Sequence, residues 1–576
     1  MTHGEKRPVP AGVLWTEEGI SFSVAVPKGK NCRLCIYRGK KTEPYREISM
    51  EEDILYGDIR SSGIQRGLKD GDEYLYFIDD EPYVDPYAHG IRKYTGQDEN
   101  GLETEYVRAL LCAPDFDWDN DRPLDLPDED IIAYSLHVRG YTKSQGSKVK
   151  NRGTFGGIIE KIPYLKELGI NQIQCMPVYE FEDHIRLARN YWGYGEAYCF
   201  APKSRYASSN PVRELKEMVK TCHQAGIEVI LHLPFYDAMP KQKMIECLRY
   251  YRQEFHADGF VVNPYTVPLE VIQSDDYLKN LKLIVKNDEF QTVMRRFLKG
   301  DEGMIESVIW HLKHLCQNDH QYHYITDHTG FTLCDLVSYD GKHNELNGEN
   351  NHDGPDYNYS WNCGVEGPTR KKAVVKLREQ QMRNAFFLLL MAQGTPCILA
   401  GDEFANSQNG NNNVYCQDND IAWVNWKKAE KEQWLTDYVK ALIRFRKEHR
   451  ILHPAEECQG IDLTHCGVPD VSYHGENAWQ VPNEIASRQL GVFYSGATKR
   501  EKDLYIAYNM HWEDHTFALP SLPKGKHWRK IFTTTVQEGF LESNGEVCQE
   551  RKAVIEARSI AVFTGEAYES EDTCKK

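Results

Sequence analysis

Short runs in which apolar and polar residues alternate fill the first 118 positions of the chain. GISFSVAVP and NCRLCIYRGK are two of these runs, and turn-forming residues separate them. Alternation with a period of two sends successive side chains to opposite faces of a strand. The pattern predicts an all-β domain over residues 1–118, most simply a β-sandwich. Trp15 and Trp118 could form a sugar-stacking platform in it, but packing in the core or between domains is the interpretation we favour.

From about residue 127, short apolar strands alternate with amphipathic helices. EVILHLPF and DGFVVN have strand character, whereas PVRELKEMVKTCHQAG carries apolar residues at helical spacings of three and four. Repeated strand–helix units imply a parallel sheet, and their number predicts an α/β domain, a (β/α)8 TIM barrel over residues 119–452. YHYITDH and PCILAGDEF are predicted to supply its last strands. Runs such as KDLYIAYNM predict a C-terminal β-sandwich over residues 453–576.

Composition and net charge narrow the classes of molecule that the chain is expected to bind. The net charge of −17 is spread along the chain, which argues against nucleic acid and anionic membrane as partners. The opening MTHGEKRPVPAG lacks the apolar core of a signal peptide, and no run of about 18 apolar residues follows it. The 16 cysteines have no framework spacing, which suits reduced thiols and predicts a cytoplasmic protein. Cys32 and Cys35 form a CxxC pair within a predicted strand, where buried small side chains are the favoured interpretation.

One segment, from Tyr324 to Thr369, is the first place to look for chemistry. It begins like a buried strand and passes at His328 into a long loop rich in Asn, Asp and Gly. A strand that opens into an irregular polar loop is the usual position of an active site in α/β barrels. The residue after His328 is Thr329, a hydroxyl where a catalytic carboxylate is expected.

Several long segments resemble one enzyme family, the isoamylase-type glycogen and starch debranching enzymes of the α-amylase superfamily (glycoside hydrolase family 13). The matching pieces are YSLHVRGYT, GTFGG, IPYLKELGI, NYWGY, FAPKSRYASS and LLLMAQGTPCILAGDEFANSQNGNNNVYCQDNDIAW, together with the segment that starts at Tyr324. The resemblance covers nearly the whole predicted barrel. It implies an N-terminal sandwich like a carbohydrate-binding module, a catalytic barrel and a C-terminal β domain.

The resemblance also implies a retaining cleavage of α-1,6 glucosidic branches, which needs a carboxylate nucleophile and an acid/base carboxyl group roughly 5–5.5 Å apart. The family's DGFRFD motif reads DGFVVN here, so the nucleophile position is Asn263 and its supporting arginine is Val261. The acid position of LIAE is Lys286, and the third carboxylate, of HDG, is Thr329. A neutral amide cannot form the glycosyl ester. We therefore predict a catalytically inactive homologue, a pseudoenzyme.

Other positions of the resemblance keep groups that bind sugar. Tyr194 in NYWGY matches the aromatic residue that stacks on the sugar at the cleavage subsite, and Trp192 lies beside it. His328 keeps the sugar-binding imidazole. His232 and Asp237 occupy the Asp and His positions of the strand-three motif. These five residues are the predicted substrate-binding set, with packing at the barrel mouth as the alternative for the two aromatic residues.

No cofactor or metal is predicted. The loop 343–361 could hold Ca²⁺ through its Asp and Asn oxygens, but turn chemistry is favoured. His320, His323 and His328 lack a zinc spacing. The acidic pair Asp402–Glu403 is interpreted as structural, as in the family.

Three hypotheses remain at this point. The favoured one is a non-catalytic homologue in the cytoplasmic metabolism of glycogen or a similar α-glucan, which binds glucan, associates with an active debranching enzyme, or does both. The second is an active hydrolase with unorthodox residues; Asp288 or Glu289 could then supply a carboxylate. The third is a cleft reused for another ligand, because only residues 238–257 separate the strand-three motif from Asp258, whereas the family carries a longer insertion there.

Overall fold

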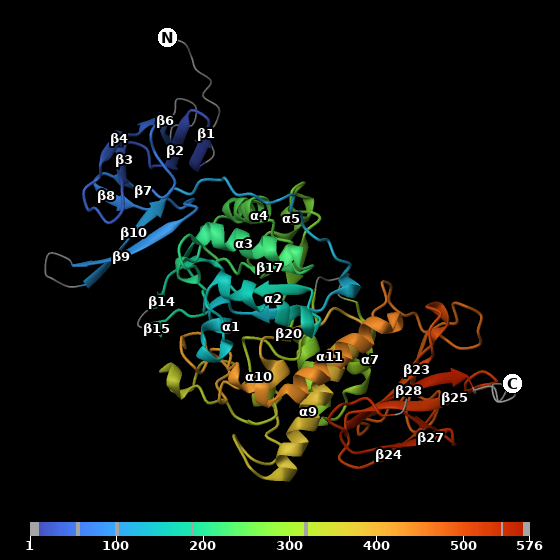
Figure 1. Cartoon of the computed structure of the whole chain (residues 1–576). Coiled ribbons are helices and arrows are strands. Elements are labelled where there is room, and N and C mark those ends of the chain that lie inside the picture. The colour runs from blue at the N-terminus through green and yellow to red at the C-terminus, as the bar shows by residue number, and fades with distance from the viewer. Residues whose placement is uncertain are drawn as a thin grey trace, which may run out of the picture. The chain divides into compact units, whose positions relative to one another are not determined.

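The computed structural model describes residues 11–52, 58–97, 103–185, 188–315, 321–542 and 545–567 (Figure 1). The chain folds as two compact units. The first comprises Met1–Leu124, Val149–Glu160 and Cys175–Lys282, and the second comprises Asp125–Lys148, Lys161–Gln174 and Leu283–Lys576. The first ten residues of the predicted N-terminal domain and the last nine of the C-terminal one lie outside the described part.

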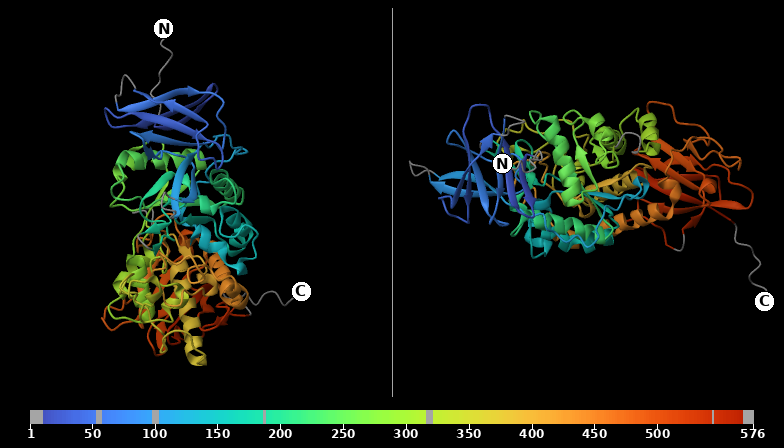
Figure 2. Two further views of the ribbon diagram at one scale, coloured as in Figure 1. Left: turned by 90° about the vertical axis from the view of Figure 1, so that its left-hand side faces the viewer. Right: turned by 90° about the horizontal axis from the view of Figure 1, so that it is seen from above.

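The N-terminal part of the first unit is a β-sandwich, drawn in blue in Figures 1 and 2. One sheet has the order β1-β2-β6-β5 and the other β4-β3-β7-β10-β9, with β8 paired to β7. The strands are β1 Gly12–Thr16, β2 Gly19–Ala25, β3 Cys32–Tyr37, β4 Arg46–Ser49, β5 Glu51–Glu52, β6 Ile59–Gln65, β7 Glu73–Ile78, β8 Glu81–Tyr83, β9 Ile91–Gln97 and β10 Glu103–Leu110.

The inward-facing residues of the two sheets meet in one core, which confirms the predicted all-β sandwich. Phe22 of β2 and Tyr74 of β7 are fully buried, and their rings meet edge to face with centroids 5.1 Å apart. Cys32 and Cys35 lie buried in β3 with free thiols, and burial raises the pKa of Cys32 to about 11. They pack as small apolar side chains, as the sequence indicated.

The rest of the first unit alternates strands and helices: β13 Tyr179–Phe181, β14 His184–Ile185, β15 Ala188–Arg189, β16 Ala197–Pro202, α3 Pro211–Gln224, β17 Glu228–His232, α4 Lys241–Phe255, β18 Gly259–Val262 and α5 Leu269–Ser274. Helix α3 shows why its sequence is helical. Asn210 caps it by accepting a hydrogen bond from the backbone N–H of Arg213 (3.1 Å), and Pro211 occupies its first turn. Leu215, Met218, Val219 and Cys222, spaced by three and four, are buried.

The second unit continues the alternation. Its elements up to residue 452 are β11 Ala133–Leu136, α1 Val138–Lys143, α2 Phe155–Leu168 and β12 Gln172–Cys175 (both of which continue into the first unit), β19 Lys282–Val285, α6 Glu289–Lys299, α7 Ile305–Lys313, α8 Leu333–Leu336, α9 Lys372–Met391, β20 Cys397–Leu399, α10 Lys427–Lys431 and α11 Gln433–Glu448. Short 3-10 turns, among them η6 at Asp402–Phe404, complete it.

Each unit contains a parallel pair of strands: β17 pairs with β18 in the first, and β11 pairs with β20 in the second. This is the parallel strand and helix alternation that the sequence predicted. Among the described residues, none of the helices combines the length and apolar composition needed to cross a membrane.

The prediction of a full strand at YHYITDH is wrong, because the paired region is much shorter. This segment makes only an isolated parallel bridge, from His323 to Pro396. The carbonyl of Ile325 accepts a hydrogen bond from Nε of Arg295 (2.7 Å), a buried side chain. Because a guanidinium occupies an acceptor that a neighbouring strand would otherwise use, the ladder stops there.

The C-terminal part is again β-rich, as predicted, and is drawn in red in Figure 1. A six-stranded sheet has the order β21-β22-β23-β28-β25-β26, and β24 pairs with β27. The strands are β21 Val471–His474, β22 Gln489–Tyr494, β23 Leu504–Asn509, β24 His515–Ala518, β25 Lys526–Thr533, β26 Glu546–Val547, β27 Lys552–Ile555 and β28 Ser559–Ala567. Phe517 of β24 and Ile555 of β27 join Phe563 of β28 in one core, so both sheets contribute to it.

Candidate functional site

The NYWGY segment forms a hydrogen-bonded aromatic loop in the first unit. Nδ2 of Asn190 donates to the carbonyls of Glu182 and Tyr194 (both 2.9 Å), and its Oδ1 accepts from the N–H of Gly193 (3.0 Å). Gly193 has φ of +86°, and a Cβ there would lie 2.4 Å from the ring of Phe181. Only glycine fits both conditions, so this loop conformation is strongly specified.

This loop brings three of the predicted residues together. The rings of Trp192 and Tyr194 meet edge to face with centroids 6.0 Å apart, and Tyr194 meets His232 at 5.8 Å. Trp192 is buried, which agrees with a packing role, whereas Tyr194 is half-buried and keeps part of its ring accessible. His232 is the last residue of β17, where barrel enzymes place functional groups.

Asn263 directly follows β18, and its side chain shapes a turn. Its Oδ1 accepts from the N–H of Tyr265 (3.0 Å), and its carbonyl accepts from the N–H groups of Thr266 and Val267 (both 3.1 Å). An Asn that bonds the backbone two residues on forms an Asx turn. Val261, at the position of the family's supporting arginine, is buried among apolar groups. The predicted nucleophile position is therefore occupied by a turn-forming amide.

Two further residues of the first unit, Asp237 and Tyr265, are exposed to solvent near the turn that Asn263 forms. Asp237 is exposed, and its Oδ1 accepts from the hydroxyl of Thr266 (3.2 Å). Tyr265 is 96% exposed. The sequence analysis missed Tyr265, because periodicity does not reveal how far a turn residue projects into solvent.

In the second unit, Lys286 and Thr329 are in direct contact. Lys286 directly follows β19, and its Nζ donates to the Thr329 hydroxyl (2.6 Å) and lies 2.5 Å from Oδ2 of Asp327. The Thr329 hydroxyl in turn donates to Oδ1 of Asp327 (3.0 Å). The positions predicted to match the family's acid and third carboxylate thus hold a cation and a hydroxyl that bond to each other and to Asp327.

Asp327 is the buried carboxylate of this group that sequence reasoning overlooked. It is 7% exposed; burial alone would raise its pKa, but the Lys286 ammonium, His328 and the bond from Thr329 hold that pKa below its usual range. Burial, followed by the nearby Lys286 charge, lowers the pKa of His328 to about 3, so its imidazole is neutral. The signal in the sequence was an Asp directly before His328, in TDHTG.

The other carboxylates considered are engaged elsewhere in this unit. Asp288 is exposed and accepts from the Tyr324 hydroxyl (2.6 Å), while Glu289 begins α6. Asp402 accepts from the N–H of Leu333 (2.9 Å) and from Thr326, and Glu403 accepts from the hydroxyls of Tyr134 (2.8 Å) and Tyr164 (2.7 Å). Burial raises the pKa of Asp402 to about 7. This buried pair ties loops together, which fits a structural role.

The Asn-rich loop is held by its own amides. Asn347 donates to Asp353 (2.7 Å), and Asn344 donates to the carbonyl of Asp353 (2.8 Å) and to Asn412 (2.8 Å). Within the described ranges, no group of three or more His, Cys, Asp or Glu residues is placed to hold a metal ion. His320 lies outside those ranges. That the protein binds no metal ion stays a prediction.

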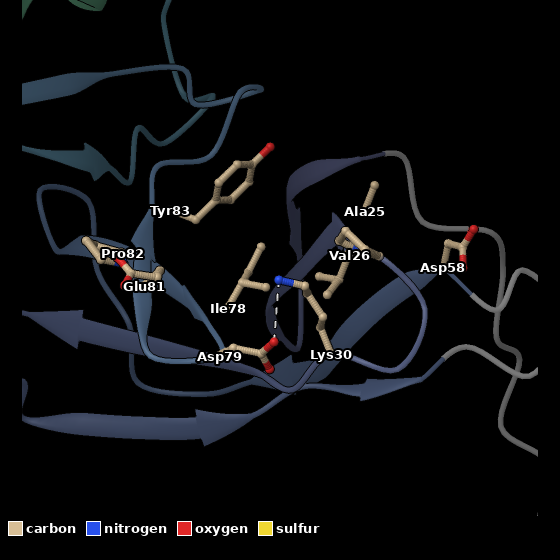
Figure 3. A pocket seen from close by; sticks show the side chains of 10 residues that line it. Ala25, Val26, Lys30, Asp58, Ile78, Asp79, Glu81, Pro82 and Tyr83 are labelled. Atoms are coloured by element: carbon tan, nitrogen blue, oxygen red, sulfur yellow. Dashed lines mark ion pairs between the residues drawn. The ribbon is translucent and has the colours of Figure 1, made fainter.

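The sandwich carries a separate hollow of about 590 Å³ (Figure 3). Val26, Ile78 and Tyr83 line it, with an ion pair between Lys30 and Asp79 (3.5 Å). None of the residues predicted to bind sugar lines it. Trp118 stacks on His256 with ring centroids 3.8 Å apart, and Trp15 packs against the sandwich core, so both tryptophans have packing roles.

Comparison with known proteins gives one consistent family. The alpha amylase catalytic-domain family matches residues 136–239. A glycogen debranching enzyme from Erwinia tasmaniensis is 31% identical over 77% of this chain and 84% of that protein. The chloroplastic isoamylase 3 of Oryza sativa subsp. japonica is 30% identical over 92% of this chain and 82% of that protein.

Solved structures agree on the fold. The catalytic module of the glycogen-degrading pneumococcal virulence factor SpuA superposes with a TM-score of 0.75 at 16% identity, covering 98% of this chain and 99% of that one. Pullulanase type I from Bacillus subtilis, solved with maltose, gives 0.71 at 17% identity, covering 97% and 85%. The fold is thus an α/β TIM barrel with flanking β-rich domains, and the chain belongs to the isoamylase-type glycogen and starch debranching enzymes of the α-amylase superfamily.

Proposed function

We propose that this chain is an α-glucan-binding member of the debranching family that no longer hydrolyses the branch and acts in α-glucan metabolism through binding. The observation that carries the proposal is the contact among Lys286, Thr329 and Asp327. Where the family's retaining reaction uses an acid and a third carboxylate, this chain has a cation and a hydroxyl, both satisfied by one buried carboxylate.

The nucleophile is the first missing part. A retaining reaction forms an ester between a carboxylate and the sugar's anomeric carbon. The Asn263 amide is a poor nucleophile, and its oxygen already accepts a backbone hydrogen bond from Tyr265. Val261 offers no cation to orient a carboxylate, even if deamidation produced one.

The proton donor is the second missing part. Lys286 is the only ionisable group at the acid position, and its ammonium bonds Asp327 and Thr329. Passing a proton from Lys286 to a leaving-group oxygen would leave Asp327 as a buried, unpaired anion, which is costly. General acid catalysis is worth about 10²–10⁴-fold, and covalent catalysis is lost as well.

The chain keeps side chains that can bind a sugar without taking part in cleavage of its glycosidic bond. Tyr194 offers a partly open aromatic face, Asp237 an exposed carboxylate and His328 a neutral imidazole. Such groups can stack on glucose rings and bond hydroxyls without any change of charge. Relatives named for glycogen and starch chemistry, and neighbours solved with maltose, support an α-glucan as the ligand.

The test is to measure hydrolysis and binding on one purified sample of the full chain. We expect retardation in native gels that contain glycogen, and no release of reducing ends from glycogen or pullulan. Release of reducing ends that disappears in D327N would overturn the proposal in favour of a hydrolase with unorthodox residues. Absence of retardation would overturn glucan binding and favour a cleft reused for another ligand.

Association with an active debranching enzyme is the second part of the proposal. A chain that keeps the fold of the family without its catalytic carboxylates is suited to act as a subunit that brings glucan to an active partner. We expect the chain to co-elute with an active isoamylase-type enzyme in size-exclusion chromatography and to raise its activity on glycogen. Separate elution together with unchanged activity would contradict this part only.

A further inference from the structure

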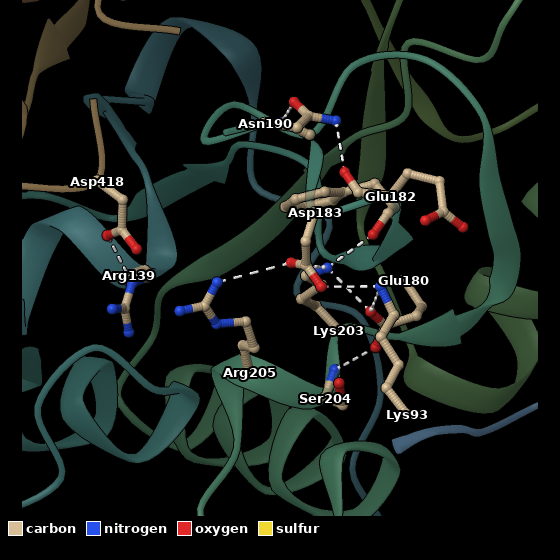
Figure 4. A network of polar contacts seen from close by, with 12 residues as sticks. Lys93, Arg139, Glu180, Glu182, Asp183, Asn190, Lys203, Ser204, Arg205 and Asp418 are labelled. Carbon is tan, nitrogen blue, oxygen red and sulfur yellow. Dashed lines mark hydrogen bonds and ion pairs between the residues drawn. The ribbon is translucent and has the colours of Figure 1, made fainter. Parts of the chain in front are cut away.

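A buried network of charges lies beside the aromatic loop in the first unit (Figure 4). Lys203 follows β16 and is 1% exposed. Its Nζ donates to Oε1 of Glu180 (2.9 Å), to the carbonyl of Phe181 (2.7 Å) and to Oδ1 of Asp183 (2.9 Å). One ammonium group thus joins three positions of a four-residue segment.

Two further residues close the network. Lys93, from strand β9 of the sandwich, donates to Oδ2 of Asp183 (2.8 Å) and lies 3.5 Å from Oε1 of Glu180. The N–H of Ser204 donates to Oε2 of Glu180 (2.7 Å). Every carboxylate oxygen of Glu180 and Asp183 therefore has a partner, as a buried charge requires.

The network is connected to Tyr194 by a continuous series of hydrogen bonds. The N–H of Asn190 donates to the carbonyl of Asp183 (2.8 Å). Nδ2 of Asn190 donates to the carbonyls of Glu182 and Tyr194, and its Oδ1 accepts from Gly193. Figure 4 shows Asn190 next to the Glu182 and Asp183 segment. Segment 180–183 therefore determines where Asn190 lies, and Asn190 determines where the aromatic residues lie.

Regular structure alone holds this segment weakly. Strand β13 spans only Tyr179–Phe181, and its pairing with β16 shifts register between Tyr179 and Glu180. A buried ion pair adds little net stability compared with an apolar replacement, and its best-attested value is to specify one arrangement. The charges are thus placed where a short, irregular ladder holds segment 180–183 only weakly.

We propose that Lys203 is a positioning residue for glucan binding, which holds segment 180–183 so that Tyr194, with Trp192 packed beside it, is pre-organised to stack on the sugar. Lys93 extends the same network to the sandwich, so a strand of that domain helps to shape the aromatic loop. The inference rests on the proposed function, since it assigns Lys203 a part in the same glucan site. Pre-organisation raises affinity by removing the ordering cost from the binding step.

The test compares K203M with a matched variant, K216M. Lys216 is 3% exposed, lies in the same unit and pairs with Glu254 (2.9 Å), but has no bond to the aromatic loop. We expect K203M to weaken maltoheptaose binding about tenfold and to speed amide exchange in the peptide 188–196. K216M should be destabilised without either change.

Two further variants keep the test decisive. K93M removes one contact to Asp183 and should shift both readouts the same way by a smaller amount, so it serves if K203M does not fold. K203M/E180Q removes one charge of each sign and should regain stability but not affinity. Equal exchange in K203M and K216M, or wild-type affinity in K203M, would overturn the proposal. If the wild type binds no maltoheptaose, the proposed function fails, and amide exchange still tests the positioning.

Discussion

The predicted sugar-binding positions of the first unit and the predicted catalytic positions of the second unit differ in how their polar groups are engaged. In the first unit, Tyr194, His232 and Asp237 keep aromatic and polar groups that are partly accessible. In the second, Lys286 and Thr329 bond to each other and to Asp327, so the polar groups there satisfy one another. A binding residue needs only shape and hydrogen bonds, whereas a catalytic carboxylate must keep its charge available.

The substitution with the largest expected effect removes the ion pair between Lys286 and Asp327 in the second unit. K286M leaves Asp327 buried without its cation, which should cost about 3–5 kcal/mol in the free energy of unfolding at pH 7. Since the folded pKa of Asp327 is lowered, the contribution of the pair is full above the unfolded pKa of about 3.9 and is lost as the pH falls below it. Urea unfolding of wild type and K286M at pH 7 and pH 3 measures this.

The double variant K286M/D327N is the control for that experiment. With neither charge present, most of the lost stability should return. A K286M protein within about 1 kcal/mol of wild type at pH 7 would mean that the ion pair does not exist in solution.

Truncation of the aromatic residue in the first unit should give the next largest effect. Y194A removes the stacking face, so maltoheptaose should bind about 30-fold more weakly, equivalent to about 2 kcal/mol. Y194F keeps the ring and should stay within about threefold of wild type. Titration calorimetry checks both, and Y277A, which alters a 60% exposed tyrosine of the same unit, is the control. Unchanged binding by Y194A would remove Tyr194 from the site.

Asp402 tests whether the acidic pair of the second unit is structural. Burial raises its folded pKa to about 7, so the folded state holds a proton that the unfolded chain releases near pH 4. Stability should therefore fall by about 2 kcal/mol as the pH rises from 5 to 7. D402N should flatten this slope, as chemical unfolding at both pH values would show. An unaltered slope would assign the titration to another group.

The smallest expected signal comes from His328. With a pKa of about 3, its imidazole should show no titration between pH 5 and pH 8 in proton NMR, assigned by its loss in H328N. The unfolded chain should titrate near 6.5. Because the folded pKa is lowered, the contribution of His328 to stability should decline as the pH falls below that value. A folded-state midpoint above 5 would show that solvent reaches the ring.

Local patterns predicted most elements and failed at identifiable places. Helix α3 follows its cap and its apolar spacing closely, because both signals lie within the helix itself. The strand expected at YHYITDH is reduced to an isolated bridge because Arg295, which lies in helix α6, donates a hydrogen bond to the carbonyl of Ile325. The cytoplasmic location and the domain boundaries at 118 and 452 stay predictions.

The sequence by itself determined the alternation of strands and helices and the family, and it predicted the replacement of carboxylates at Asn263, Lys286 and Thr329. Each of these depends on the identity of residues at short spacing. Only the tertiary structure decided what the replacements do. Lys286 meets Thr329 across 43 residues of sequence, and Asp327 completes the pair. No local pattern encodes such a contact, because it forms only when the fold brings distant segments together and burial makes an unpaired charge too costly.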